Sequence, residues 1–146
     1  MPAAPVSPEA DAFLRRPNGA VVATIRRDGS PFTAATWYDW DGEHILMNGD
    51  AGRLRIRHMR RDPRVSVTVF DPGNWYWQLT LVGRIDEIRD DDGYVDIDRL
   101  AMRYIGGRYP DRSSPRVSMR MAVDTWNGWD PVRYTVWQPG VTVPPM

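Results

Sequence analysis

The residues best suited to chemistry in this sequence are the arginines of one segment, residues 48–64, which reads NGDAGRLRIRHMRRDPR. Two apolar residues three positions apart, Ile56 and Met59, predict a helix that ends before the proline of this segment. Arg53 and Arg55 fall in its first turn and flank the apolar stripe. Helical side chains lean toward the N-terminus, where unpaired backbone N–H groups favour anions. The spacing therefore favours a site for a phosphate group.

The other arginines of this helix invite a second interpretation, a nucleic-acid-binding surface. That interpretation is disfavoured because residues 86–98 are rich in acidic side chains and the 19 basic residues of the chain balance its 19 acidic ones. We expect Arg57, Arg60 and Arg61 to form a solvated face of the helix instead.

The motifs of the common catalytic machineries are absent. The sequence contains no GxGxxG, GxxxxGK, GxSxG or HExxH pattern. It also has no Cys and no Lys, which excludes thiol, disulfide and Schiff-base chemistry. Only two histidines are present, His44 and His58, and their separation does not suit a metal site. We expect both on the surface or in the core, and we predict no metal site.

Aromatic residues gather beside the predicted turns, where they would lie at the rim of a barrel. They form three groups: Trp37, Tyr38 and Trp40; Trp75, Tyr76 and Trp77; and Trp126 with Trp129. A rim position suits a planar ligand or a second subunit. For any single tryptophan, packing in the core or in a dimer interface remains the favoured interpretation.

The elements that must position these residues are mainly strands. Alternation and turn signals predict strands over residues 20–26, 32–40, 43–47, 64–70, 75–88, 117–123 and 134–137, and helices over residues 8–15, 53–61 and 94–105. The first three strands are expected to form a meander through the turns Asp28-Gly29 and Asp41-Gly42. Because no βαβ rhythm is present, the pattern predicts a mainly β protein, an antiparallel barrel with two or three short helices.

We expect one domain over residues 1–146, with residues 1–7 and 139–146 loose or arm-like. No run approaches the length of apolar residues that a membrane span needs, and no targeting segment is visible, so the prediction is a cytoplasmic protein without membrane contact. The acidic front of the third helix, residues 90–98, is expected to face solvent.

The order of these segments resembles the pyridoxamine 5'-phosphate oxidase-like family of FMN-binding split β-barrels. The resemblance runs from about Pro17 to Trp129 and is carried by the motifs RxDGxP, WYxWDG, ILMN, GRxRxRxMRRDPRVSV and LxLVGRIDEI. More narrowly, the chain is similar to the deazaflavin branch, the small reductases that depend on coenzyme F-420 and include biliverdin reductases.

The resemblance implies a homodimer with two cofactor sites at the subunit interface. It assigns the cofactor phosphate to a basic pair that falls on Arg53 and Arg55, although relatives usually have Lys at the second position. It assigns the ring system to strand residues that map onto Thr36, Trp37, Met47 and Asn48. Contacts from the partner subunit would come from Trp77, Gln78 and Trp126.

The function implied is that of an oxidoreductase, in which a hydride passes between reduced coenzyme F-420 and an unsaturated small-molecule substrate. A cofactor that carries the difficult step explains why no catalytic triad is needed. Tyr38, Asp39 and solvent all remain open as the proton donor. Two alternatives remain as well: an FMN-dependent oxidase or reductase, and a non-catalytic dimer that binds a cofactor or a tetrapyrrole.

Overall fold

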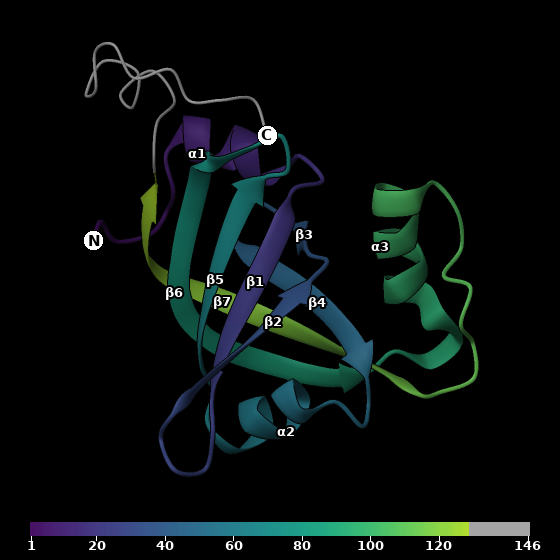
Figure 1. The fold of residues 1–146 in the computed structure, drawn as a ribbon. Coiled ribbons are helices and arrows are strands. Elements are labelled where there is room, and N and C mark those ends of the chain that lie inside the picture. Colours follow the sequence, from purple (N-terminus) through teal and green to yellow (C-terminus); the bar gives the residue numbers. More distant parts are fainter. Residues whose placement is uncertain (129–146) are drawn as a thin grey trace.

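The computed structural model describes residues 1–128, which form seven strands, three α-helices and one short 3-10 helix (Figure 1). In chain order these are α1 (Pro8–Leu14), β1 (Gly19–Ile25), β2 (Pro31–Thr36), β3 (Asp39–Trp40), β4 (His44–Asp50), α2 (Leu54–Arg61), β5 (Arg64–Asp71), β6 (Asn74–Asp90), η1 (Asp92–Tyr94), α3 (Val95–Ile105) and β7 (Arg116–Gly128). The predicted strand over residues 134–137, the tail 139–146 and Trp129 lie outside the described residues.

The strands form one antiparallel sheet in the order β2-β1-β5-β6-β7-β4-β3. Its two edge strands, β2 and β3, are separated in the chain only by Trp37 and Tyr38. The three steps from β2 to β3 span at most about 11 Å, whereas the edges of a flat sheet of this size would lie about 29 Å apart. The sheet must therefore curl until its edges approach each other, and the protein is the expected antiparallel split barrel (Figure 1).

The closure of the barrel breaks one predicted strand in two. Residues 32–40 do not form a single strand in a meander, because β2 pairs with β1 whereas β3 pairs with β4 at the opposite edge. At the break, Tyr38 is completely buried, and its hydroxyl donates a 2.8 Å hydrogen bond to the carbonyl oxygen of Leu14. The meander prediction was therefore wrong, since each half of the segment meets a different edge of the closing sheet.

The interior of the barrel contains the alternating apolar residues predicted from the sequence. Val65, Val67 and Val69 of β5 are buried, as are Leu79, Leu81 and Ile85 of β6 and Val117, Met119 and Met121 of β7. The two long strands β6 and β7 approach closely at Gly83, where an added Cβ would overlap the carbonyl oxygen of Ala122. The pairing register shifts at this point, so the glycine lets the strands bend around the core.

Helix α2 begins one residue later than the sequence predicts. Arg53 has extended backbone angles, φ −66° and ψ 139°, and is the N-cap residue rather than a first-turn residue. The first helical residue is Leu54. Ile56 and Met59 are buried as expected, so the apolar stripe fixes the helix against the barrel and leaves Arg53 at its start.

The acidic front of α3 does not simply face solvent. Asp91 and Asp96 are buried, and the carboxylate of Asp91 accepts hydrogen bonds from the backbone N–H groups of Asp96 (2.9 Å) and Ile97 (3.0 Å). Asp96 in turn accepts from Arg89 and Ser118. The expectation of a solvated segment was wrong for these two residues, because the first turn of a helix needs acceptors for its N–H groups.

A single arginine joins α3 to the segment that follows α1 and to the break between β2 and β3. The guanidinium of Arg103 donates hydrogen bonds to the backbone carbonyl oxygens of Leu14, Arg15, Arg16 and Tyr38. These acceptors belong to the end of α1 and to the break between β2 and β3. The side chain therefore fixes α3 beside the point where the barrel closes.

The first residues of the chain are also held in place. Ala3 forms an isolated bridge with Thr125, and the N–H of Ala4 donates a 2.9 Å hydrogen bond to the carbonyl oxygen of Asp124. The sequence predicted a loose segment here, whereas the structure pairs it with the end of β7. Among the described helices, none is both long and apolar enough to cross a lipid bilayer.

Candidate functional site

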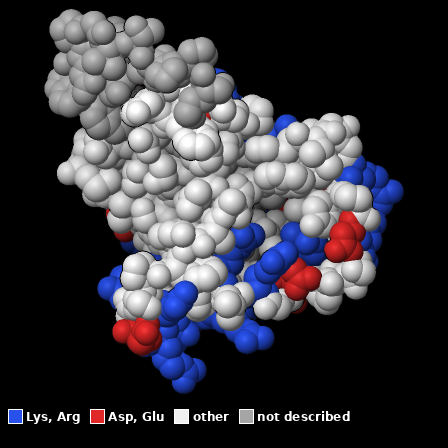
Figure 2. All heavy atoms as spheres, viewed as in Figure 1, with Lys and Arg blue, Asp and Glu red and all other residues white. Residues whose placement is uncertain are grey.

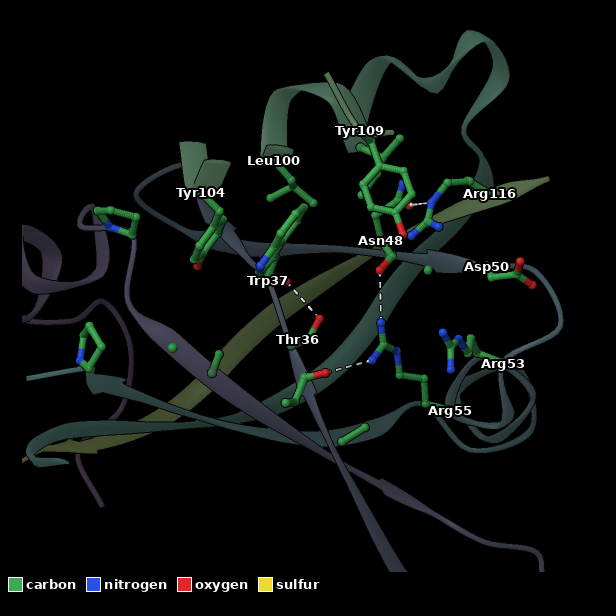
Figure 3. A pocket seen from close by; sticks show the side chains of 18 of the residues that line it. Thr36, Trp37, Asn48, Asp50, Arg53, Arg55, Leu100, Tyr104, Tyr109 and Arg116 are labelled. Atoms are coloured by element: carbon green, nitrogen blue, oxygen red, sulfur yellow. Dashed lines mark hydrogen bonds between the residues drawn. The ribbon is translucent and has the colours of Figure 1, made fainter. Parts of the chain in front are cut away.

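A cleft of about 680 Å³ lies between the sheet and α3. Its lining comes from parts of β1, β2 and β4, the end of β5, the start of α2, one side of α3 and the start of β7. Figure 2 shows basic side chains gathered around the lower part of this hollow, and Figure 3 shows the residues that line it. The cleft has a cationic end, an aromatic wall and an apolar end, which are described in turn.

The cationic end is built around Arg55, whose side chain crosses from α2 to the sheet. Its guanidinium donates hydrogen bonds to the carbonyl oxygens of Ala35 (3.2 Å) in β2 and Asn48 (3.1 Å) in β4, so two strands hold it (Figure 3). Its Nε is buried and has no hydrogen-bond partner in the described part of the chain. Burial, with the like charges of Arg53 and Arg116, lowers the pKa of Arg55. The group remains protonated near neutrality because its ordinary pKa is so high.

Two further arginines line the same end, Arg53 from the start of α2 and Arg116 from the start of β7. Arginines elsewhere in the chain, such as Arg89 and Arg112, are paired with carboxylates. In contrast, within residues 1–128 neither Arg53, Arg55 nor Arg116 forms a salt bridge. We call these three residues the arginine cluster. It concentrates positive charge that no carboxylate of residues 1–128 neutralises by direct contact.

Asn48 connects the cluster to the rest of the protein. Its Oδ1 accepts a 2.8 Å hydrogen bond from the Nε of Arg116, and its backbone oxygen accepts the bond from Arg55. Its Nδ2 donates to Asp91 (3.0 Å) and to the hydroxyl of Ser118 (3.1 Å). The side chain is 4% exposed, and both polar atoms of its amide are bonded to protein groups. Asn48 therefore orients neighbouring side chains.

The aromatic wall joins the barrel closure to α3. The ring planes of Trp37 and Tyr104 are stacked with centroids 5.2 Å apart, and Tyr109 meets the indole of Trp37 edge-on at 6.1 Å. The hydroxyl of Tyr104 donates a 2.7 Å hydrogen bond to the carbonyl oxygen of Asn18. Burial raises the pKa of this hydroxyl, which favours its neutral form. The wall is therefore flat, aromatic and uncharged.

The apolar end of the cleft is lined by Pro17, Gly19, Phe70 and Pro72. Gly19 of β1 lies opposite Phe70 of β5 in the sheet, and a Cβ on Gly19 would lie 2.6 Å from the Cζ of that ring. The glycine therefore lets the phenyl ring lie across the strand, as part of the cleft floor. No charged side chain belongs to this end of the described lining.

The structure brings together most of the site residues expected from one chain. Arg53, Arg55, Thr36, Trp37 and Asn48 all line the cleft. Met47 does not, because it points into the barrel and is completely buried in the core.

The three residues expected from a partner subunit do not line the cleft of their own chain. Trp77 packs against Phe13 with ring centroids 5.2 Å apart, and Gln78 is paired with Phe70 across the sheet. Trp126 is packed against the core, and its indole nitrogen has no hydrogen-bond partner among the described residues.

The two residues that remained open as proton donors, Tyr38 and Asp39, are not part of the lining. Tyr38 is buried with its hydroxyl bonded to backbone carbonyls, and burial raises the pKa of that group. Asp39 forms a salt bridge of 3.3 Å with Arg99. Neither residue lines the cleft.

Among the lining residues with a polar or charged side chain, sequence reasoning missed four, Asp50, Tyr104, Tyr109 and Arg116. Only Asp50 carries a local signal, since it precedes the helix that holds the basic pair. Its pKa is lowered by the N–H of Gly52 and by Ser114, with smaller contributions from Arg116 and Arg53, so it is ionised near neutrality. The other three become neighbours only when α3 and β7 meet the barrel closure.

The two histidines do not contribute to the cleft. His58 is buried, and its Nδ1 lies 2.8 Å from the hydroxyl of Thr24, while His44 lies beside Asp41 at 3.1 Å. Within residues 1–128, no group of three or more potential ligand side chains could hold a metal ion.

The donor set fits a planar ligand that carries a phosphate. Among residues 1–128, the buried Nε of Arg55 has no partner and the arginine cluster has no carboxylate in contact, so an anionic group can use the donors of this cluster. The stacked pair Trp37 and Tyr104 offers a flat surface next to it. A flavin or deazaflavin phosphate has both features.

Comparison with known proteins finds solved structures with a similar fold. An F-420 reductase has 29% sequence identity and a TM-score of 0.74, with 85% of this chain and 98% of that chain covered. A conserved hypothetical protein from Mycobacterium tuberculosis has 24% identity and a TM-score of 0.71 over 97% of this chain and 94% of its own.

A more distant structure shares the fold. A Clostridium acetobutylicum protein of the pyridoxinephosphate oxidase family, related to general stress protein 26 of B. subtilis, has 16% identity and a TM-score of 0.60, covering 85% of this chain and 87% of that chain. In addition, the family model for pyridoxamine 5'-phosphate oxidase matches residues 6–130. Since that match covers most of the sequence and the fold is the same split barrel, the chain belongs to the pyridoxamine 5'-phosphate oxidase family.

Proposed function

We propose that the protein is an oxidoreductase that uses coenzyme F-420, with Arg53 and Arg55 at the cofactor phosphate and an unsaturated organic molecule as substrate. The observation that carries the proposal is the cleft itself, in which guanidiniums without a salt bridge to any of residues 1–128 lie at one end and the flat wall of Trp37 and Tyr104 lies beside them. The 29% identity to an F-420 reductase favours the deazaflavin over FMN.

The cofactor supplies the hydride chemistry when bound, so the protein needs to bind, orient and shield. Arg55 is held by two backbone carbonyls, which fixes the direction of its remaining donors. Trp37 is held by the stack with Tyr104 and presents a rigid surface. Preorganised groups of this kind lose little freedom on binding, which favours affinity.

In this proposal the substrate binds at the apolar end of the cleft, around Phe70. Pro17 and Pro72 border it, and the ring of Phe70 is supported by close packing on Gly19. An uncharged, conjugated molecule suits such a surface, whereas a carboxylate or ammonium group would lose its hydration without gaining a partner. We therefore propose quinones or enones as the substrate class to test first.

We also propose that the protein is a homodimer in which the partner subunit completes each site. The residues for this role are Trp77, Gln78 and Trp126, which lie outside the cleft of their own chain. Sedimentation of the purified protein tests the oligomeric state. If the protein is a monomer and still binds F-420 at micromolar concentrations, the partner subunit is not needed to complete the site.

Titration of the protein with F-420 and, separately, with FMN tests which of the two cofactors it binds. We expect F-420 to bind at micromolar concentrations and Arg55→Ala to weaken it by about 100-fold, because a charge-assisted contact is lost in a partly buried site. Arg60→Ala is the matched control, since Arg60 is exposed on the same helix and does not line the cleft. Equal effects of the two variants would contradict the phosphate assignment.

The FMN-dependent alternative keeps the same cleft and predicts the opposite order of affinities. Tight binding of FMN without binding of F-420 would support that alternative.

Turnover separates an enzyme from a carrier. If the protein is an enzyme, reduced F-420 should be oxidised in the presence of a quinone or enone. Variants of Phe70 should then raise the KM for that substrate without changing the affinity for F-420.

A further inference from the structure

The arginine cluster holds more positive charge than the pair predicted from the sequence. Arg116 joins Arg53 and Arg55 from a different part of the chain, 61 residues after Arg55 in the printed numbering. Its guanidinium also lies 4.5 Å from the ring centroid of Tyr109, which covers one side of it (Figure 3). The side chain is therefore held between an amide and an aromatic ring rather than free in solvent.

The charge of the site can be counted from its lining. Three guanidiniums carry three positive charges, and Asp50 is the acidic side chain in the described lining. The N–H of Gly52 bonds to the Asp50 carboxylate at 2.9 Å, which favours its ionised form. Two positive charges remain uncompensated. A ligand group with one negative charge would leave one guanidinium without a counter-charge, whereas a group with two would neutralise the cluster.

The orientation of Arg116 depends on Asn48. The Oδ1 of Asn48 accepts from the Nε of Arg116, while its Nδ2 is held by Asp91 and Ser118. With Nε used in this bond, the two terminal nitrogens of Arg116, a residue that lines the cleft, remain as donors. Both N–H groups of the Asn48 amide are used within the protein, so the amide has no donor left for an anion, and its influence on a bound anion passes through Arg116.

We propose that Arg116 is a third anion-binding residue of the site, that Asn48 is its positioning residue, and that the complete cluster takes a ligand portion with two negative charges. This proposal rests on the proposed function for the identity of the bound cofactor. The two charges can belong to a phosphate monoester, or to a phosphodiester with a neighbouring carboxylate.

Binding measurements on four probes test the charge count: FMN, riboflavin, coenzyme F-420 and inorganic pyrophosphate. For each probe that carries two or more negative charges, we expect Arg116→Ala to weaken binding by about 10- to 100-fold and to reduce its dependence on salt. Arg116→Lys should restore part of the salt dependence. The matched control is Arg120→Ala, since Arg120 lies on the same strand and is paired with Asp86.

The source of the two charges is distinguished by pH. The second ionisation of a phosphate monoester lies near pH 6, so the affinity for FMN should fall by about tenfold between about pH 7.5 and about pH 5. A phosphodiester has no such ionisation, and its binding should remain unchanged over the same range. Riboflavin, which has no phosphate, should be insensitive to every arginine variant.

The positioning role of Asn48 is tested by a double-mutant cycle. If Asn48 acts through Arg116, Asn48→Ala and Arg116→Ala should each weaken pyrophosphate binding by a similar factor, and the double variant should be no weaker than the single ones. Additive losses would overturn the positioning role. Thermal unfolding of each variant identifies any that fails to fold, and Asn48→Ser then replaces it with a shorter acceptor.

The outcomes separate this inference from the proposed function. If neither F-420 nor FMN binds but pyrophosphate binds in an Arg116-dependent way, the cofactor assignment fails and the anion site stands. If a cofactor binds and Arg116→Ala changes its dissociation constant by less than about threefold, the proposed function stands and this inference is overturned.

Discussion

The indole of Trp37 lies parallel to the phenol ring of Tyr104, with the ring planes 3° apart. One ring belongs to the break between β2 and β3, and the other belongs to α3. The stack therefore joins the closure of the barrel to α3, the helix that lines the cleft on the side facing the sheet. A ligand at this wall would meet a surface whose two parts hold each other in place.

Replacing Trp37 by Ala should weaken both cofactor binding and the fold. The stacked pair contributes about 1 kcal/mol beyond its buried area, so we expect a loss of that order in stability and about a tenfold loss in affinity. Trp75→Ala is the control, because Trp75 is 61% exposed and does not line the cleft. Denaturant unfolding and fluorescence titration measure the two effects, and equal affinities of both variants would contradict a role for the wall.

Removal of the Asp91 carboxylate should destabilise the start of α3. Its two oxygens accept from the N–H groups of Asp96 and Ile97 and from the amide of Asn48, so Asp91→Ala should cost about 1–3 kcal/mol. Asp92→Ala should change the free energy of unfolding by about 0.5 kcal/mol or less, since that neighbour is exposed. Urea unfolding compares the two, and similar stabilities would show that the carboxylate is not an important cap.

Gly83→Ala should be strongly destabilising. The added Cβ would overlap the backbone oxygen of Ala122, which cannot move without separating β6 from β7. We expect a loss of about 3 kcal/mol. Gly107→Ala provides a matched control because no atom lies within 4 Å of its Cβ position. If both variants unfold at the same urea concentration, the close approach of the two strands is not essential.

The buried contact between His58 and Thr24 should make stability depend on pH. Burial, with Arg61 and Arg26, lowers the pKa of the imidazole from its ordinary value of 6.5. The unfolded chain then binds more protons below that value, so stability should be complete above it and decrease as the pH falls through the folded pKa. His58→Gln should reduce this pH dependence and His44→Gln should not, as measured by unfolding between about pH 7.5 and about pH 5.

The parts of the fold that follow from local patterns were predictable. Alternation in residues 64–70 and 117–123 predicted strands β5 and β7, and the spacing of Ile56 and Met59 predicted the buried face of α2. The Asp28-Gly29 turn likewise predicted the hairpin of β1 and β2. Each of these features depends on residues close together in the chain.

The remaining features depend on closure of the barrel. The break after Thr36 follows from the two edges of the sheet meeting, and nothing in the apolar pattern of residues 32–40 marks it. In the same way, Arg116 reaches the cleft because β7 pairs with β4 in a register that places Arg116 opposite Asp50. A local pattern predicts how a segment folds, whereas this pairing decides which distant side chains share a site.

The hydrogen bonds of Arg103 have a kinetic consequence. Four backbone carbonyls, from the end of α1 and from Tyr38, converge on its guanidinium, so α3 cannot separate from the barrel without losing all of them together. Opening of the cleft by movement of this helix is then a form of unfolding rather than a low-energy fluctuation. Backbone amides of α3 should therefore exchange with solvent as slowly as those of the central strands. Ligands should enter a cleft whose walls are already formed.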